Sequence, residues 1–91
     1  MLPVQWRRSA LDEIDAVVNY IAQYNPADAE ELHQRIESSV LHLSEHPYLF
    51  RFARVPDTRE IFAHPDYTVV CRVLADCVEI VSVVHASREY P

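Results

Sequence analysis

The side chains best suited to chemistry gather at the end of the chain. His85, Arg88 and Tyr90 stand close together, directly after an apolar run. His is the usual general acid or base near neutral pH, Arg can stabilise a transition-state phosphate, and Tyr can stack on a base or donate a proton. Together they would suit RNA cleavage. The alternative is a frayed and solvated tail, because chain termini are ordered only when something holds them.

Arginine supplies all of the basic side chains, because the eight Lys and Arg residues include no lysine. The planar guanidinium fits carboxylate or phosphate and cannot act as a base at neutral pH. For Arg59, a solvated charge that protects the edge of a sheet is an alternative to a binding role. Four arginines on neighbouring predicted elements suggest a surface that faces an anion: Arg51, Arg54, Arg59 and Arg72.

Arg72 lies in an apolar run whose pairing can be predicted. If the hairpin turns symmetrically about Ala75 and Asp76, Arg72 lies opposite Glu79. One interpretation is a cross-strand ion pair. The other is that Arg72 projects into a concave surface and grips a phosphate or a carboxylate. The two interpretations are compatible if Glu79 only orients the guanidinium.

Several classes of site lack the residues that they need. The chain has no glycine, so it has no Gly-rich phosphate loop. Cys71 and Cys77 are too few for a disulfide framework or a zinc site, and we interpret them as small apolar sheet residues. We therefore expect no metal and no cofactor. The remaining histidines are interpreted as surface or turn residues: His33, His42, His46 and His64.

Acidic side chains dominate the first half of the chain. The formal net charge is −6, and between Asp12 and Glu45 eight acids face a single base, Arg35. Non-specific nucleic-acid binding needs a field of positive charge, so we expect no direct nucleic-acid contact. There is no apolar run long enough to span a membrane and no pattern of a secretory signal. These absences predict a cytoplasmic protein without membrane contact.

Two helices are predicted in the first half. Ser9 is expected to cap the first helix, with Asp12 in the position of a capping box. Asn25 and Pro26 end it and begin the second helix, which stops at His46 because a proline follows. The short connection makes the pair an antiparallel hairpin. The predicted apolar stripes are Leu11, Ile14, Val18 and Ile21 on the first helix and Ala29, Leu32, Ile36, Val40 and Leu43 on the second.

Four strands are predicted around this hairpin. They cover residues 2–6, 59–63, 67–74 and 78–84, and residues 48–58 form a loop. The helices must cover one face of the sheet to bury their stripes. A chain of 91 residues has room for one domain, residues 1–91. The sequence predicts an α+β fold of order β-α-α-β-β-β, in which the helical hairpin packs on one face of a small, mostly antiparallel sheet.

Several segments also carry a resemblance that covers nearly the whole chain. They are the first strand ending in Trp6, Ala10 and Asp15 in the first helix, Leu43-Ser44-Glu45-His46-Pro47, Arg59-Glu60-Ile61, Tyr67-x-x-x-x-Arg72-Val73, and Val83-Val84-His85-Ala86-x-Arg88-x-Tyr90-Pro91. In these segments the chain resembles the RelE/ParE superfamily of toxins from bacterial toxin–antitoxin pairs. The predicted order of elements is also that of the superfamily's fold.

The resemblance implies one of two activities. RelE-like members cleave mRNA in the ribosome, whereas ParE-like members inhibit DNA gyrase. The Ser-Glu-His-Pro helix exit and the His-Ala-x-Arg-x-Tyr-Pro ending are more similar to the ParE branch. Ribosome-dependent members tend to be basic and to use Lys and Arg around the scissile phosphate, whereas this chain is acidic and has no lysine. We therefore expect a ParE-like inhibitor of gyrase rather than an enzyme. A ribosome-dependent mRNA endonuclease is the alternative.

Either branch implies a cognate antitoxin and a toxin–antitoxin hetero-oligomer. We expect an extended or helical antitoxin segment to cover apolar surface that so small a core cannot hide. If the chain were a nuclease, His85, Arg88 and Tyr90 would be its catalytic residues. The residues expected to bind the target are Arg59, Arg72, His85, Arg88 and Tyr90.

Overall fold

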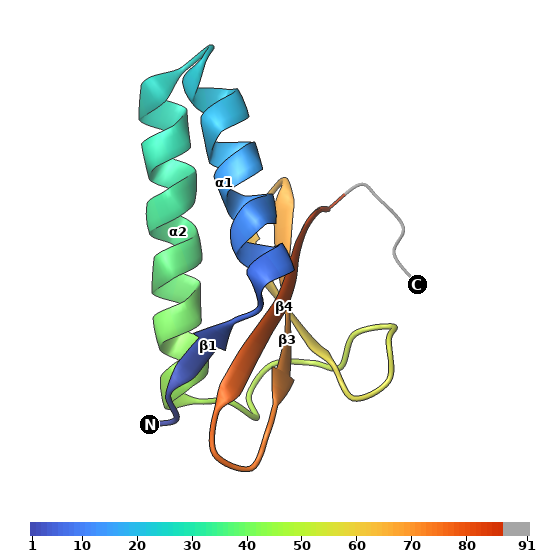
Figure 1. Ribbon diagram of the computed structural model, residues 1–91. Coiled ribbons are helices and arrows are strands. Elements are labelled where there is room, and N and C mark those ends of the chain that lie inside the picture. Colours follow the sequence, from blue (N-terminus) through green and yellow to red (C-terminus); the bar gives the residue numbers. More distant parts are fainter. Residues whose placement is uncertain (87–91) are drawn as a thin grey trace.

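The computed structural model describes residues 1–86 and shows two helices beside a small sheet (Figure 1). The predicted order β-α-α-β-β-β is confirmed. The elements are β1 (Val4–Trp6), α1 (Arg8–Ala22), α2 (Pro26–Glu45), β2 (Arg59–His64), β3 (Tyr67–Val73) and β4 (Val78–His85).

The sheet is mixed, with strand order β1-β4-β3-β2. The short strand β1 pairs parallel with β4, and the other neighbours are antiparallel. The β3–β4 register places Arg72 opposite Glu79, which confirms the predicted pairing. Farther along, the register shifts by one residue so that Val81 is left without a partner in the ladder. This bulge bends β4 locally, which changes the direction of the neighbouring side chains.

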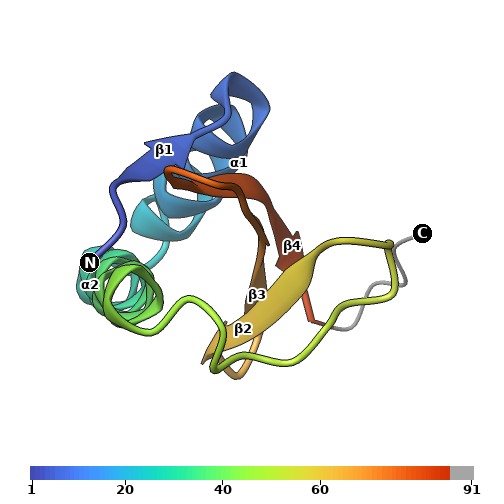
Figure 2. The same ribbon diagram turned by 90° about the horizontal axis from the view of Figure 1, so that it is seen from below.

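The helical hairpin covers one side of β3 and β4, and the loop of residues 46–58 passes on the other side (Figure 2). The core forms where the helices meet the sheet, and apolar burial there is the main force that holds the layers together. Leu32, Ile36 and Leu43 from α2 and Val69 and Ile80 from the sheet are all at most 1% exposed. The small core is therefore centred on α2, β3 and β4.

The start of α2 matches its sequence signals. Pro26 occupies the first turn, and the side chain of Asn25 accepts a hydrogen bond from the backbone N–H of Asp28 at 3.2 Å. The helix ends at Glu45, directly before His46. Both predicted boundaries are confirmed.

The predicted start of α1 is wrong by two residues. The helix begins at Arg8, with Arg7 as its N-cap and no capping side chain, so Ser9 lies inside the first turn. The reason is tertiary, because the Arg7 backbone N–H donates to Ile80 O at 3.0 Å and thereby extends the β1–β4 pairing. The helix starts as soon as that pairing ends.

The apolar stripe of α1 also differs at its first position. Leu11 is 37% exposed, whereas Ala10 is fully buried. A methyl side chain allows the helix to approach β4 closely where the chain has just left the sheet. Ile14 is buried and Val18 and Ile21 pack partly against the core, as predicted.

The predicted loop is present and is tied to β2 at its end. Phe52 forms an isolated antiparallel bridge with Arg59, and the Ala53 N–H donates to Thr58 O at 2.9 Å. Between them, Asp57 has a positive φ of 65°. Asp tolerates this left-handed conformation better than most residues, so it serves in a turn that glycine would otherwise occupy.

Candidate functional site

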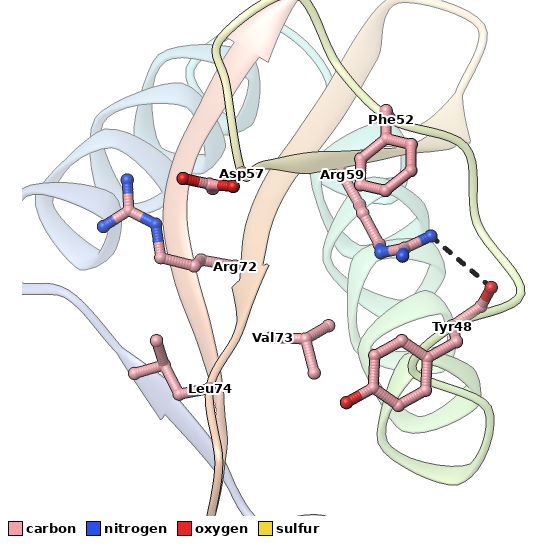
Figure 3. Close-up of a pocket in the computed structure, with 7 residues that line it drawn as sticks. All are labelled: Tyr48, Phe52, Asp57, Arg59, Arg72, Val73 and Leu74. Carbon is pink, nitrogen blue, oxygen red and sulfur yellow. Dashed lines mark hydrogen bonds between the residues drawn. The ribbon is translucent and has the colours of Figure 1, made fainter.

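A cleft lies between the loop and the end of β3. Its volume is about 590 Å³. We call it the arginine cleft because two of the predicted target-binding residues, Arg59 and Arg72, line it together (Figure 3). Its lining consists of Tyr48, Phe52, Asp57, Arg59, Arg72, Val73 and Leu74.

Arg59 fastens the loop to β2. Its Nη1 donates to the backbone carbonyls of Phe50 at 2.6 Å and of Tyr48 at 3.4 Å. Its guanidinium also lies over the rings of Phe52, 4.2 Å from the centroid, and of Tyr48, at 5.4 Å. These contacts fix the cation and leave its charge without a carboxylate partner among residues 1–86. Arg59 therefore combines a structural role with a positive potential at the cleft.

Arg72 has no such partners. The predicted ion pair with Glu79 is wrong, because Glu79 Oε1 instead accepts from Arg7 Nη2 at 3.0 Å. The Nε of Arg72 is buried and has no hydrogen-bond partner within residues 1–86. Figure 3 shows the Arg59 and Arg72 side chains pointing to opposite sides of the cleft. The two arginines share one lining without converging on one point.

The other two arginines of the predicted anion-facing surface lie around a second cleft of about 430 Å³. Arg51 Nε contacts Glu60 Oε1 at 2.7 Å, and its guanidinium lies 4.6 Å from the Phe62 ring centroid. Arg54 lines the same cleft and is exposed. Phe52 belongs to both linings. The four arginines are thus divided between two clefts rather than gathered in one.

His85 ends β4, and its ring contacts Tyr67. The two ring centroids are 5.2 Å apart in an edge-to-face arrangement, and His64 lies 6.1 Å from Tyr67 on the other side. Tyr67 and Arg72 stand at opposite ends of β3, five residues apart. At about 3.3 Å per residue, roughly 16 Å of strand separates their levels. Arg88 and Tyr90 lie outside the described residues.

Exposed apolar side chains line both clefts, and Leu49 follows one of them, Tyr48, in the chain. We call them the aromatic patch. Phe62 in β2 and the start of the loop carry no sequence motif that predicts an interaction surface. A proline before Tyr48 and another at position 56 restrict this segment, which was the available signal. The patch consists of Tyr48, Leu49, Phe52 and Phe62, which are 61–69% exposed.

Neither cysteine is poised as a nucleophile. Burial raises the pKa of the Cys71 thiol to about 11. The pKa of Cys77 is raised first by desolvation and then by the neighbouring charge of Asp76. A thiol reacts as its thiolate, so both remain inert near neutral pH. Within residues 1–86 no group of three or more His, Cys, Asp or Glu side chains could hold a metal ion, and no helix is long and apolar enough to cross a membrane.

Comparison with known proteins identifies the chain's relatives. The family described as "ParE toxin of type II toxin-antitoxin system, parDE" matches residues 4–90. Toxin RelE2 of Caulobacter vibrioides is 32% identical over 88 residues, which cover 97% of this chain and 99% of that protein.

Solved structures confirm the fold. A chain of the chromosomal ParDE toxin–antitoxin system from P. aeruginosa superposes with a TM-score of 0.81 at 20% identity, covering 93% of this chain and 96% of that one. A copper-bound mutant toxin from Helicobacter pylori gives a TM-score of 0.62 at 14% identity, covering 99% and 100%. The names RelE and ParE both occur among these relatives, so they agree on the superfamily and differ on the branch. The chain belongs to the ParE toxin family of type II toxin–antitoxin systems, within the RelE/ParE superfamily.

Proposed function

We propose that this toxin is ParE-like in its action: it inhibits DNA gyrase by binding to it, and a cognate antitoxin neutralises it. Residues 1–91 act as one toxin domain in the cytoplasm. The proposed target-binding residues are those expected from the sequence: Arg59, Arg72, His85, Arg88 and Tyr90.

The separation of His85 from the arginine cleft carries this proposal. RNA cleavage needs a proton-transfer group within hydrogen-bond reach of the reacting oxygens, while arginines hold the phosphate. His85 pairs with Tyr67 at one end of the β3–β4 ladder, and Arg72 stands at the other end, about 16 Å away along the strand. The cleft lining itself contains no histidine or lysine. This arrangement favours binding over cleavage.

The aromatic patch supports a protein as the target. Aromatic side chains and arginine are enriched at the centres of protein interfaces, where they contribute most of the binding energy. Phe52 is 68% exposed and lies beside Arg59, which its ring contacts. Both proposed partners, gyrase and the antitoxin, are proteins. The net charge of −6 further disfavours binding through nucleic acid alone.

A gyrase supercoiling assay tests this proposal. The purified chain at micromolar concentration should inhibit supercoiling or trap cleaved DNA, and adding the antitoxin should restore activity. Arg72→Ala should weaken inhibition at least tenfold. Arg8→Ala is the matched control, because it removes the same charge from a side chain that is 87% exposed. Folded protein without any effect on gyrase would exclude the proposal.

An mRNA endonuclease is the second candidate, and one contact favours it. The His85 ring packs edge-to-face against Tyr67 in a fixed position, as a general acid or base requires, and a relative bears the name RelE2. If this candidate is right, the chain cuts mRNA in a translation extract and His85→Ala abolishes the cuts. An intact transcript in the presence of the unmutated chain would exclude it.

A further inference from the structure

A smaller pocket shares Arg72 with the arginine cleft, and its lining does not include Arg59. Its volume is about 280 Å³. We call it the valine pocket, because valines from the loop, β3 and β4 make up half of its lining. Its lining consists of Arg7, Val55, Thr58, Val70, Arg72, Val81, Ser82 and Val84.

The bulge in β4 shapes this pocket. Val81 is the residue without a ladder partner, so it lines the pocket together with Ser82, its neighbour in the chain. The hydroxyls in the lining are already engaged. Ser82 Oγ donates to Glu13 Oε1 at 2.9 Å, and Thr58 Oγ1 donates to Val55 O at 2.6 Å. The side-chain hydrogen-bond donors that remain for a ligand are therefore those of the two arginines.

The two arginines differ in their charge balance. Arg7 is neutralised by Glu79 at 3.0 Å. Among residues 1–86, Arg72 forms no ion pair, its buried Nε has no acceptor, and no acidic side chain lines the pocket. A guanidinium without a carboxylate partner can form charge-assisted hydrogen bonds with an anionic ligand, and these are stronger than bonds between neutral groups. The missing group is therefore an anion at Arg72.

The pocket's size and walls restrict which anion fits. A volume of about 280 Å³ is below the usual range for cofactor sites and suits one or two side chains. Apolar walls favour a ligand that carries an aliphatic group next to its charge. A carboxylate matches the planar guanidinium in a bidentate pair. A nucleic-acid phosphate would approach a chain of net charge −6 and would bring no apolar group for the valines.

We propose that the valine pocket is a carboxylate-binding subsite, which receives from a protein partner a Glu or Asp side chain that stands next to an aliphatic residue. The carboxylate binds the Arg72 guanidinium, and the aliphatic group contacts the valines. Arg7 also lines the pocket, and its charge is neutralised by Glu79. This subsite does not require gyrase to be the partner, so it stands or falls independently of the proposed function.

The test is an NMR titration of the isolated chain, observing the arginine Nε–Hε signals. The probe is 4-methylpentanoate, which joins a carboxylate to an aliphatic group, and 4-methylpentanamide is its neutral isostere. The acid should shift the Arg72 signal saturably in the millimolar range and leave the Arg8 signal in place. The amide should bind at least tenfold more weakly.

Inorganic phosphate and a variant complete the experiment. Phosphate should shift the Arg72 signal less than the carboxylate does at equal concentration. If phosphate shifts it and the carboxylate does not, the site is one for a nucleic-acid backbone and the proposal is wrong. Absence of any saturable shift at Arg72 also overturns it. In Arg72→Gln, the valine methyl signals should lose their response to the acid, whereas Arg8→Gln should keep it.

Discussion

Replacing Arg72 by methionine should stabilise the isolated domain. Methionine keeps an unbranched apolar stem of similar length and removes the buried N–H that has no acceptor within the described residues. Relief of such an unsatisfied group is worth about 1–3 kcal/mol. The substitution also removes the cross-strand attraction between the charges of Arg72 and Glu79, which lie opposite each other without forming an ion pair; that attraction is worth at most about 0.2–1 kcal/mol.

The difference predicts a gain of about 1 kcal/mol in the free energy of unfolding, since the unmet hydrogen bond outweighs the cross-strand attraction. For a domain of this size the gain corresponds to a rise in Tm of roughly 4–8 °C. Urea denaturation followed by circular dichroism and by the fluorescence of Trp6, which packs partly against the core, measures it. The control Arg8→Met removes an exposed charge and should change stability by less than about 0.5 kcal/mol.

A loss of about 1 kcal/mol or more in Arg72→Met, with an unchanged denaturant slope, would refute this reasoning. It would mean that Arg72 contributes to the fold through an attraction larger than the cost of its buried nitrogen. The predicted result has a functional counterpart. If removal of Arg72 both stabilises the free toxin and weakens inhibition, the residue is retained for binding rather than for folding.

Other perturbations test the fold and its buried groups. Asn25→Ala removes the N-cap of α2 and should lower the free energy of unfolding in urea by about 1 kcal/mol. An unchanged free energy of unfolding would contradict the role of Asn25 as the cap. Leu32→Ala should cost about 2–5 kcal/mol, whereas Leu41→Ala, at a position 56% exposed, should cost less than about 0.5 kcal/mol; similar losses would contradict the placement of the core. Because burial raises the pKa of Cys71 from 9.0 to about 11, the unfolded chain loses this proton first as pH rises. Stability should therefore fall between pH 9 and pH 11, by up to about 1.4 kcal/mol per pH unit, and Cys71→Val should lack that component of the fall.

The elements of the fold could be predicted from local signals. Asn25, followed by proline, marks the helix junction because its side chain accepts a backbone N–H, and the symmetric turn places Arg72 opposite Glu79. The start of α1 could not be predicted in the same way. Ser9 is a good local cap, but the hydrogen bond from Arg7 to Ile80 is a tertiary contact between residues far apart in the sequence. The backbone hydrogen bond from Arg7 to Ile80 therefore determines where α1 begins, and the capping preference of Ser9 does not.

The site was only partly predictable for the same reason. Residue type and predicted strand position indicated Arg59 and Arg72, and both line the arginine cleft. No local signal showed that Glu79 would bind Arg7, because that choice depends on the parallel pairing of β1 with β4. Because Glu79 binds Arg7, Arg72 lacks the partner that its position in the hairpin indicated. The valine pocket likewise depends on a bulge at Val81, which no turn or breaker residue marks in the sequence.

The topology of plasmid DNA in cells that express the chain without an antitoxin tests the central claim most directly. If the toxin acts on gyrase, plasmids should lose negative supercoils or accumulate double-strand breaks within minutes of induction, while ribosome-bound mRNA stays intact. Arg8→Ala should behave like the unmutated chain, and Arg72→Ala should leave the plasmids supercoiled. Fully supercoiled plasmids together with cleaved mRNA after induction of the unmutated chain would contradict the account.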